Sequence, residues 1–339
     1  MTLSATGIGS MPGGDPLAAE EENARSFTEA TRIVLGELPD LPHLPELPGR
    51  GAGAGMTGRG AALLAGLATD LQPAGWRLTD APGVDERRAR SLLGRDLDVV
   101  EELTDGYQGP FKAQVIGPWT LAATLELPRG DKVLADHGAR RELAQSLAEG
   151  LIEHVRDLRR RLPGATELLL QLDEPALPAV LAGRVPTASG YGRHRTIDLP
   201  EASDALGWVC AAVRAAGAEP IVHCCAADAP IALLRRAGAA GIAVDLARLA
   251  ATGLDELAEA VEAGDRVLLG AAPTSGQVST KQVVETVSRM FDMIGLEPTD
   301  RVVLTPACGL AGSVDTSGAP DHADVRRRLT ACREAAATF

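Results

Sequence analysis

Three residues that can act as soft metal ligands lie at two widely separated places in the chain. His223 and Cys225 are two positions apart where an apolar run ends, and Cys308 follows a second apolar run. Residues i and i+2 of a strand point to the same side, so His223 and Cys225 can reach one ion together. An imidazole with two thiolates is a zinc-type donor set, and an open position makes such a site catalytic. The intervening Cys224 is expected to pack on the opposite face.

Carboxylates follow two further apolar runs. Asp245 ends the run 242–245 and has two possible roles, a fourth metal ligand or a cap for the helix that follows. Asp173 and Glu174 lie together where another run ends. Two acids there suit the recognition of a substrate ammonium group through charge-assisted hydrogen bonds, and helix capping is the structural alternative.

Short β-type runs alternate with longer helix-type segments along the chain. We expect eight strands, at residues 7–11, 76–79, 112–116, 168–172, 220–224, 241–244, 267–269 and 301–304. The helix-type segments are residues 20–35, 85–102, 137–161, 202–215, 230–237, 254–263, 281–294 and 322–336. This alternation predicts an α/β fold with parallel strands, and eight units fit a (β/α)8 TIM barrel, with a doubly wound open sheet as the alternative.

The expected barrel explains why the candidate residues are so far apart in sequence. Active sites in such barrels lie at the C-terminal ends of the strands. The candidates at or just past such ends are His223, Cys225, Asp173, Asp245 and Cys308. We therefore expect one site on one face of a single domain that spans residues 1–339.

A proline-rich segment interrupts the alternation after the first βα unit. In residues 37–55, prolines recur every third position from Pro39 to Pro48, and a glycine-rich stretch follows. This spacing suits extended polyproline II backbone and excludes a helix interior. We interpret the segment as a long ordered Pro/Gly-rich loop over the barrel mouth, and a flexible connector is the alternative.

Composition and charge exclude several classes of partner. The 339 residues are 45% hydrophobic and 23% charged, with a formal net charge of −13. Nucleic acids and anionic membranes need a basic surface, so neither is expected as a partner. The sequence contains no apolar run long enough to span a membrane, and its start lacks the features of a secretion signal. Five cysteines, an odd number, fit a reducing cytoplasm better than a disulfide framework.

Several short motifs occur in a characteristic order. They are Gly-Ser-x-Pro at 9–12, Gly-Pro-x-Thr at 117–120, Asp-Glu-Pro-Ala-Leu at 173–177, His-x-Cys at 223–225 and Cys-Gly-Leu at 308–310. Together they resemble the catalytic C-terminal barrel of cobalamin-independent methionine synthase over nearly the whole chain. The full-length family carries a further N-terminal barrel that helps to bind polyglutamylated methyltetrahydrofolate. This chain resembles a short core form without it.

The resemblance implies a set of site residues. The family holds zinc with His, Cys, Glu and Cys, which correspond here to His223, Cys225, Asp245 and Cys308. The family's glutamate is an aspartate in this chain, one methylene shorter. The residues assigned to homocysteine are Asp173 for the amino group, Ser10 for the carboxylate, and Glu46, Glu174 and Trp119 as further contacts.

The resemblance also implies the activity. We expect a zinc-dependent methyltransferase that acts on the thiol of L-homocysteine and serves methionine biosynthesis. The family has a histidine after the seventh strand that is thought to act as an acid toward the folate, and residues 269–274 contain none. A methylated corrinoid (a methylcobamide or its carrier protein) is therefore the candidate methyl donor, and methyltetrahydrofolate is the alternative.

Two other functions are alternatives. A related zinc-dependent alkyltransferase acts on coenzyme M or another small thiol, and it needs a basic sulfonate site that Arg50 or Arg193 can supply. A zinc-storing or regulatory barrel needs no substrate at all. The response of bound zinc to added thiols separates this last alternative from both enzymes.

Overall fold

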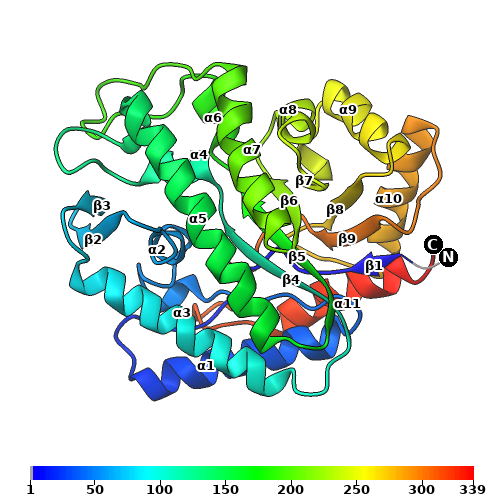
Figure 1. Cartoon of the computed structure of the whole chain (residues 1–339). Helices are drawn as coiled ribbons and strands as arrows, with labels where there is room; N and C mark the ends of the chain where they lie inside the picture. The colour runs from blue at the N-terminus through cyan, green and yellow to red at the C-terminus, as the bar shows by residue number, and fades with distance from the viewer. Residues whose placement is uncertain (1–2) are drawn as a thin grey trace.

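The computed structural model describes residues 3–339 and has an α/β architecture built on a curled parallel sheet (Figure 1). Seven strands follow the order β1-β9-β8-β7-β6-β5-β4. Their bounds are β1 Ser4–Ala5, β4 Gly109–Ile116, β5 Ala165–Asp173, β6 Glu219–Cys224, β7 Gly241–Asp245, β8 Arg266–Ala272 and β9 Val302–Pro306. Every neighbouring pair is parallel, as the β–α alternation predicts.

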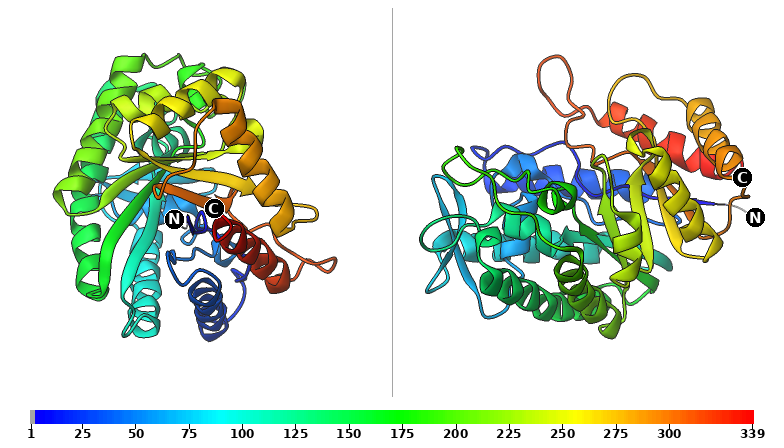
Figure 2. Two further views of the ribbon diagram at one scale, coloured as in Figure 1. Left: turned by 90° about the vertical axis from the view of Figure 1, so that its right-hand side faces the viewer. Right: turned by 90° about the horizontal axis from the view of Figure 1, so that it is seen from above.

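Helices pack around the outside of the curled sheet (Figure 2). The longer ones are α1 Glu20–Glu37, α3 Val84–Leu103, α5 His137–Arg161, α7 Leu199–Ala215, α9 Ala251–Glu262, α10 Thr280–Ile294 and α11 His322–Ala336. The shorter ones are α2 Met56–Ala61, α4 Pro118–Thr124, α6 Leu177–Leu181 and α8 Ile231–Arg236, with 3-10 turns at Pro48–Arg50, Val133–Ala135 and Leu246–Arg248. Within residues 3–339, no helix combines the length and apolar character needed to cross a membrane.

Helix α5 shows how the sequence fixes these elements. Its first turn is capped by Asp136, whose carboxylate accepts a hydrogen bond from the amide of Ala139. Leu143, Leu147 and Leu151 recur every fourth residue and are completely buried. The helix therefore turns one apolar stripe toward the sheet and a charged face toward solvent.

Backbone hydrogen bonds connect the two edges of the sheet. The amide of Leu44 donates to the carbonyl of Lys112 on β4 (2.8 Å), and the Lys112 amide donates to Pro42 (3.0 Å). On its other side, this segment pairs with the chain that follows β1, through the amide of Glu46 and the carbonyl of Gly9 (3.1 Å). Residues 42–46 thus lie between β4 and the continuation of β1.

The predicted strand at residues 76–79 exists but lies elsewhere. It is part of β3 (Gly75–Thr79), which pairs antiparallel with β2 (Ala68–Gln72) in a separate two-stranded sheet. Placing it in the main sheet was wrong, and residues 42–46 occupy that place.

Part of the proline-rich segment, which was predicted as a loop over the barrel mouth, pairs with the main sheet instead. Leu41, Leu44 and Leu47 are buried to 1% exposure or less, because the spacing of three that suits extended backbone also repeats apolar side chains. The amides of Leu44 and Glu46 remain free to pair, since proline does not occupy those positions. The sequence analysis did not predict this pairing, and polyproline II backbone for the segment stays a prediction.

The inside of the curled sheet changes from apolar to polar along the strands. Leu169 belongs to a small buried cluster contributed by the facing strands. Gln171 and Asp173 follow at alternate positions of β5 and are also buried. Because alternate residues of a strand share a side, they lie above this apolar layer, toward the C-terminal end of the sheet. A polar interior at this end is where the candidate site lies.

Candidate metal centre

The structure brings the three soft ligands together. One possible ligand atom from each of His223, Cys225 and Cys308 lies within 4.8 Å of the other two. The two sulfur atoms are 3.3 Å apart. His223 lies on β6 and Cys308 just beyond β9, and two other strands separate these in the sheet order. The curl of the sheet is therefore what closes the distance between them.

His223 is held in a form that suits metal binding. Its imidazole is buried, and Nδ1 lies 3.2 Å from the carbonyl of Ala243 on β7. A carbonyl can only accept, so Nδ1 carries a hydrogen and Nε2 is the nitrogen that can face a metal. Nε2 is buried and has no hydrogen-bond partner. An unpaired imidazole nitrogen beside two thiols fits a zinc ion.

The two thiols have different proton affinities. The contact with Cys225, together with nearby His223, lowers the pKa of the Cys308 thiol to about 4. The same contact and burial raise the pKa of the Cys225 thiol above its usual range. One sulfur of the pair is therefore readily ionised and can be stabilised by the proton on the other. A thiolate is the form in which cysteine binds a metal.

Asp245 lies beside this cluster but points to its own backbone. One carboxylate oxygen accepts a hydrogen bond from the amide of Ala247 (3.0 Å) and caps the turn Leu246–Arg248. The carboxylate is outside the three-residue cluster. The capping role is thus seen directly, and ligation of a metal by Asp245 stays a prediction.

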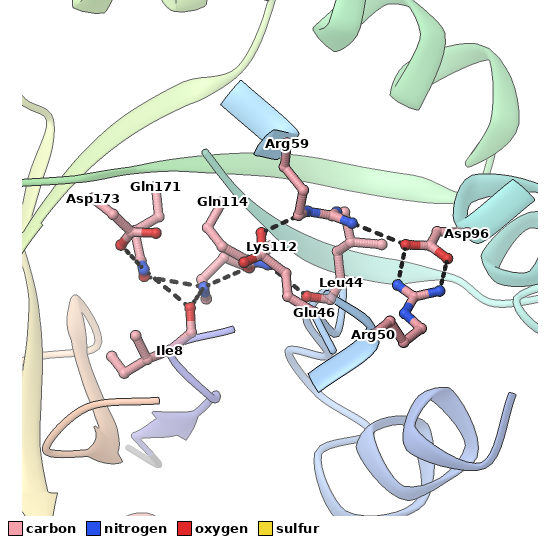
Figure 3. Close-up of polar contacts among 10 residues, drawn as sticks. All are labelled: Ile8, Leu44, Glu46, Arg50, Arg59, Asp96, Lys112, Gln114, Gln171 and Asp173. Carbon is pink, nitrogen blue, oxygen red and sulfur yellow. Dashed lines mark hydrogen bonds and ion pairs between the residues drawn. The ribbon is translucent and has the colours of Figure 1, made fainter. Parts of the chain in front are cut away.

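Asp173 lies next to the cluster at the end of β5. It is paired in register with His223 on β6, and its side chain is buried. The Gln171 amide nitrogen donates to its Oδ1 over 2.7 Å (Figure 3). Burial raises the pKa of the Asp173 carboxyl to about 7, although nearby His223 and Lys112 work in the opposite direction. A buried carboxylate of this kind gains strongly from a cationic partner.

Glu46 is held by a buried chain of ion pairs (Figure 3). Arg59 Nε donates to Glu46 Oε1 (3.1 Å), and Arg59 Nη1 donates to Asp96 (2.9 Å). Arg50 contacts both oxygens of Asp96 at 2.8 and 2.7 Å. Arg50, which the coenzyme M alternative considers as a sulfonate ligand, is therefore held in a buried ion pair with Asp96.

Ser10 lies where the first and last motifs meet. Its carbonyl accepts a hydrogen bond from the amide of Leu310 (2.7 Å), and it pairs with Glu46 in a parallel bridge. A Cβ on Gly309 would collide with Ser10 Oγ. Glycine in the Cys-Gly-Leu motif thus permits the close approach of the chain after Cys308 to the segment that carries Ser10.

Glu174 and Trp119 serve the scaffold in this structure. The Glu174 carboxylate accepts from the amides of Trp119 (2.8 Å) and Thr120 (2.7 Å) and caps helix α4. The indole nitrogen of Trp119 donates to the carbonyl of Ala202 (3.0 Å), and the ring is 1% exposed. The capping alternative for Glu174 is what the structure shows, and direct substrate contact by either residue stays a prediction.

Comparison with known proteins identifies the family. Residues 100–336 match the family described as cobalamin-independent synthase, catalytic domain. The chain belongs to this family. It is therefore a methyltransferase of the methionine synthase type that acts on a thiol. A comparison with curated proteins finds no match.

A solved structure supports the fold. The chain is similar to a B12-independent methionine synthase from Shewanella sp. W3-18-1 in complex with selenomethionine, with 16% identity and a TM-score of 0.61. The alignment covers 99% of this chain and 97% of that one. A β-mannanase from the blue mussel Mytilus edulis aligns at 10% identity and a TM-score of 0.44, over 98% and 92% of the two chains.

Sequence reasoning missed the polar residues beneath the site of this family member. Lys112 and Gln114 are buried at alternate positions of β4, and Gln171 faces them from β5. Burial lowers the pKa of Lys112 to about 8. Polar residues with a period of two inside an otherwise apolar strand were the available signal, because alternate positions share one side.

Proposed function

We propose that this family member transfers a methyl group to the thiol of L-homocysteine and gives methionine, with zinc as its cofactor. The observation that supports it best is the cluster of His223, Cys225 and Cys308 in a thiol methyltransferase. Zinc bound there would hold the substrate sulfur as a thiolate, which is the nucleophilic form. The protein supplies three donors in this proposal, and Asp245 is the nearest candidate for a fourth.

The substrate is positioned by residues beside this cluster. Asp173 accepts the ammonium group of homocysteine, because its buried carboxylate adjoins His223 in the sheet. The backbone near Ser10 meets the substrate carboxylate from the opposite rim, where the chain after Cys308 turns back. Glu46, which Arg59 holds in place, completes the polar side of the site.

We further propose that residues 1–339 form one catalytic domain of the (β/α)8 barrel type. The backbone hydrogen bonds of residues 42–46 support this, since they give the curled sheet an eighth, irregular strand. The similarity to the Shewanella enzyme over 99% of the chain also supports it. A biosynthetic role and five free cysteines together suggest the cytoplasm.

For the methyl donor we propose a methylated corrinoid. Residues 269–274 lack the histidine expected to protonate a folate leaving group, and a corrinoid needs no such acid. The description of the family and of the Shewanella enzyme as independent of cobalamin supports methyltetrahydrofolate instead. The two donors must therefore be compared directly.

The test is methionine formation by zinc-loaded enzyme from homocysteine with one donor at a time. Methyltetrahydrofolate, methylcobalamin and a methylated corrinoid protein are offered in parallel, and coenzyme M replaces homocysteine in a matched series. We expect homocysteine to be methylated and coenzyme M to be ignored, with the corrinoid arms active. Methylation of coenzyme M in preference to homocysteine would refute the proposed substrate, and activity with methyltetrahydrofolate alone would refute the proposed donor.

A further inference from the structure

Lys112 is a completely buried lysine whose ammonium group is fully hydrogen-bonded. Its Nζ lies 2.9 Å from the carbonyl of Ile8, 3.0 Å from Gln171 Oε1 and 3.3 Å from Gln114 Oε1. An ammonium has three N–H donors, and these three acceptors use all of them. Burying a charge is costly, and apolar side chains fill such positions at lower cost. A role in the site therefore explains the lysine better than stability does.

Gln171 connects this ammonium to Asp173. Its Oε1 faces Lys112, while its Nε2 donates to Asp173 Oδ1 (2.7 Å) and to the carbonyl of Ile8 (3.0 Å) (Figure 3). Gln171 and Asp173 are two positions apart on β5 and share the inner side of the sheet. Lys112 and Asp173 are thus linked through one amide group.

The direction of this amide is set from both ends, by the Lys112 ammonium on its oxygen and by the Ile8 carbonyl and the Asp173 carboxylate on its NH2 group. The two ends of a carboxamide have nearly the same shape, so only the neighbouring groups decide which end is oxygen. An ammonium is a donor without acceptor capacity, so the oxygen must face Lys112. The NH2 end must then face Asp173. In the part of the chain that the structure describes, the other carboxylate oxygen, Oδ2, accepts no hydrogen bond from the protein.

We propose that Lys112 is a positioning residue for the substrate ammonium group. It fixes the Gln171 amide, the amide fixes the Asp173 carboxylate through Oδ1, and Oδ2 remains to accept the ammonium of homocysteine. The inference rests on the proposed function, because it needs Asp173 to bind that group. Lys112 itself touches neither the substrate nor the metal ligands.

The experiment compares two thiols that differ in the ammonium group alone. Homocysteine and 4-mercaptobutyrate share the thiol and the carboxylate, and the second lacks the amine. The preference for homocysteine is measured as a ratio of kcat/KM with the most active donor, and as a ratio of Kd by calorimetry on zinc-loaded enzyme. A general loss of structure lowers kcat/KM and weakens binding for both thiols alike, and it leaves the ratios unchanged.

Lys112→Met is the principal variant, and we expect it to reduce the preference by roughly tenfold or more, the scale of one hydrogen bond to a charged group. Gln171→Glu covers the case in which Lys112→Met does not fold. A glutamate there still accepts from Lys112 but cannot donate to Asp173, so the preference is lost with the lysine intact. Gln114→Met is the matched control, since it removes an acceptor of Lys112 without touching the Gln171 link, and it keeps the preference.

Two results would overturn the inference in different ways. If Lys112→Met keeps the wild-type ratio, the positioning role is wrong and the proposed function stands. The same conclusion follows if Gln171→Glu is the only variant that folds and it keeps that ratio. If the wild-type enzyme shows no preference for homocysteine over 4-mercaptobutyrate, the assignment of Asp173 fails, and the role of Lys112 fails with it.

Discussion

Two adjoining regions of the site differ in how completely their polar groups are hydrogen-bonded. The cluster of His223, Cys225 and Cys308 has few internal partners, and the buried Nε2 of His223 has none. The polar network below it is almost completely paired. Its ammonium, amide and carboxylate groups bond to one another. The guanidinium groups of Arg50 and Arg59 donate to the carboxylates of Asp96 and Glu46.

The difference indicates separate tasks. Unpaired donor atoms that converge need an external ligand to complete them, so this cluster is where a metal fits. A largely paired network holds its carboxylates in fixed directions before the substrate arrives, and here it leaves Oδ2 of Asp173 to accept the substrate ammonium group. Substitutions in the first region should therefore change metal content, and those in the second should change substrate selection at constant metal content.

The largest expected effect is the loss of a cluster thiol. Cys308→Ser should reduce bound zinc from about one ion per chain to a small fraction and lower methionine formation by roughly a hundredfold or more, since a hydroxyl is a poor replacement for a thiolate. Zinc is measured by mass spectrometry after gel filtration. Cys224→Ala is the control, because Cys224 is fully buried on the other face and should keep the metal. Full activity of Cys308→Ser without bound metal would place the chemistry elsewhere.

The next effect separates the two regions. Asp173→Asn should raise the KM for homocysteine by about 10–100-fold, the scale of one charge-assisted hydrogen bond, while the zinc content stays that of the wild type. Loss of zinc together with substrate affinity would show that Asp173 belongs to the metal cluster and would remove the distinction.

The pH dependence of KM gives an independent check on Asp173. Burial raises the pKa of its carboxyl to about 7, so the protonated form, which cannot attract an ammonium, increases as the pH falls below 7. The KM for homocysteine, divided by the KM for 4-mercaptobutyrate, should therefore rise on acidification in the wild type and stay flat in Asp173→Asn. 4-Mercaptobutyrate shares the thiol titration and serves as the control. A wild-type ratio that does not change between pH 6 and about 8 would contradict the assignment.

Asp245 adjoins the metal cluster without being one of its three residues, so its substitution should have an intermediate effect on zinc binding. It caps the turn after β7 while adjoining the cluster, so Asp245→Asn should weaken zinc binding by about tenfold, as supporting residues of metal sites do. Competition with a chelator of known affinity measures the change. Asp198→Asn, which alters a comparable cap on α7, is the control. A loss as large as that of Cys308→Ser would make Asp245 a full ligand.

The last effect is on stability alone and concerns a buried histidine outside both regions. Burial, with a contribution from Arg59, lowers the pKa of His154 to about 4. The unfolded chain takes up this proton near pH 6.5, so stability is lost as the pH falls from 6.5 toward 4. Urea unfolding should show that His154→Gln removes about 2 kcal/mol of the loss between pH 7 and pH 5. The exposed His137→Gln is the control, and equal acid sensitivity of both variants would contradict the shift.

Much of the metal cluster could be predicted from the sequence because it depends on local rules. Apolar runs end at His223 and Cys308, parallel strands place such ends on one edge, and a period of two aligns His223 with Cys225. These arguments need no knowledge of side-chain partners. The same rules gave Asp245 two possible roles and did not decide between them.

The polar network and the strand at residues 42–46 could not be predicted from the sequence, because they depend on contacts across the fold. Lys112, Gln171 and Ile8 meet only where β4, β5 and the chain after β1 come together inside the curled sheet. Residues 42–46 do not resemble a strand, since prolines break the alternation, and they pair through the amides of Leu44 and Glu46. Residues 76–79 do resemble one, so the local pattern favoured the wrong segment.

X-ray absorption of zinc-loaded enzyme, with and without homocysteine, tests the central claim most directly. We predict that the resting site shows two sulfur neighbours, from Cys225 and Cys308, with nitrogen from His223. Homocysteine should add a third sulfur to the zinc. A sulfur count that homocysteine leaves unchanged, or a zinc signal that survives the loss of Cys225 and Cys308, would contradict the account.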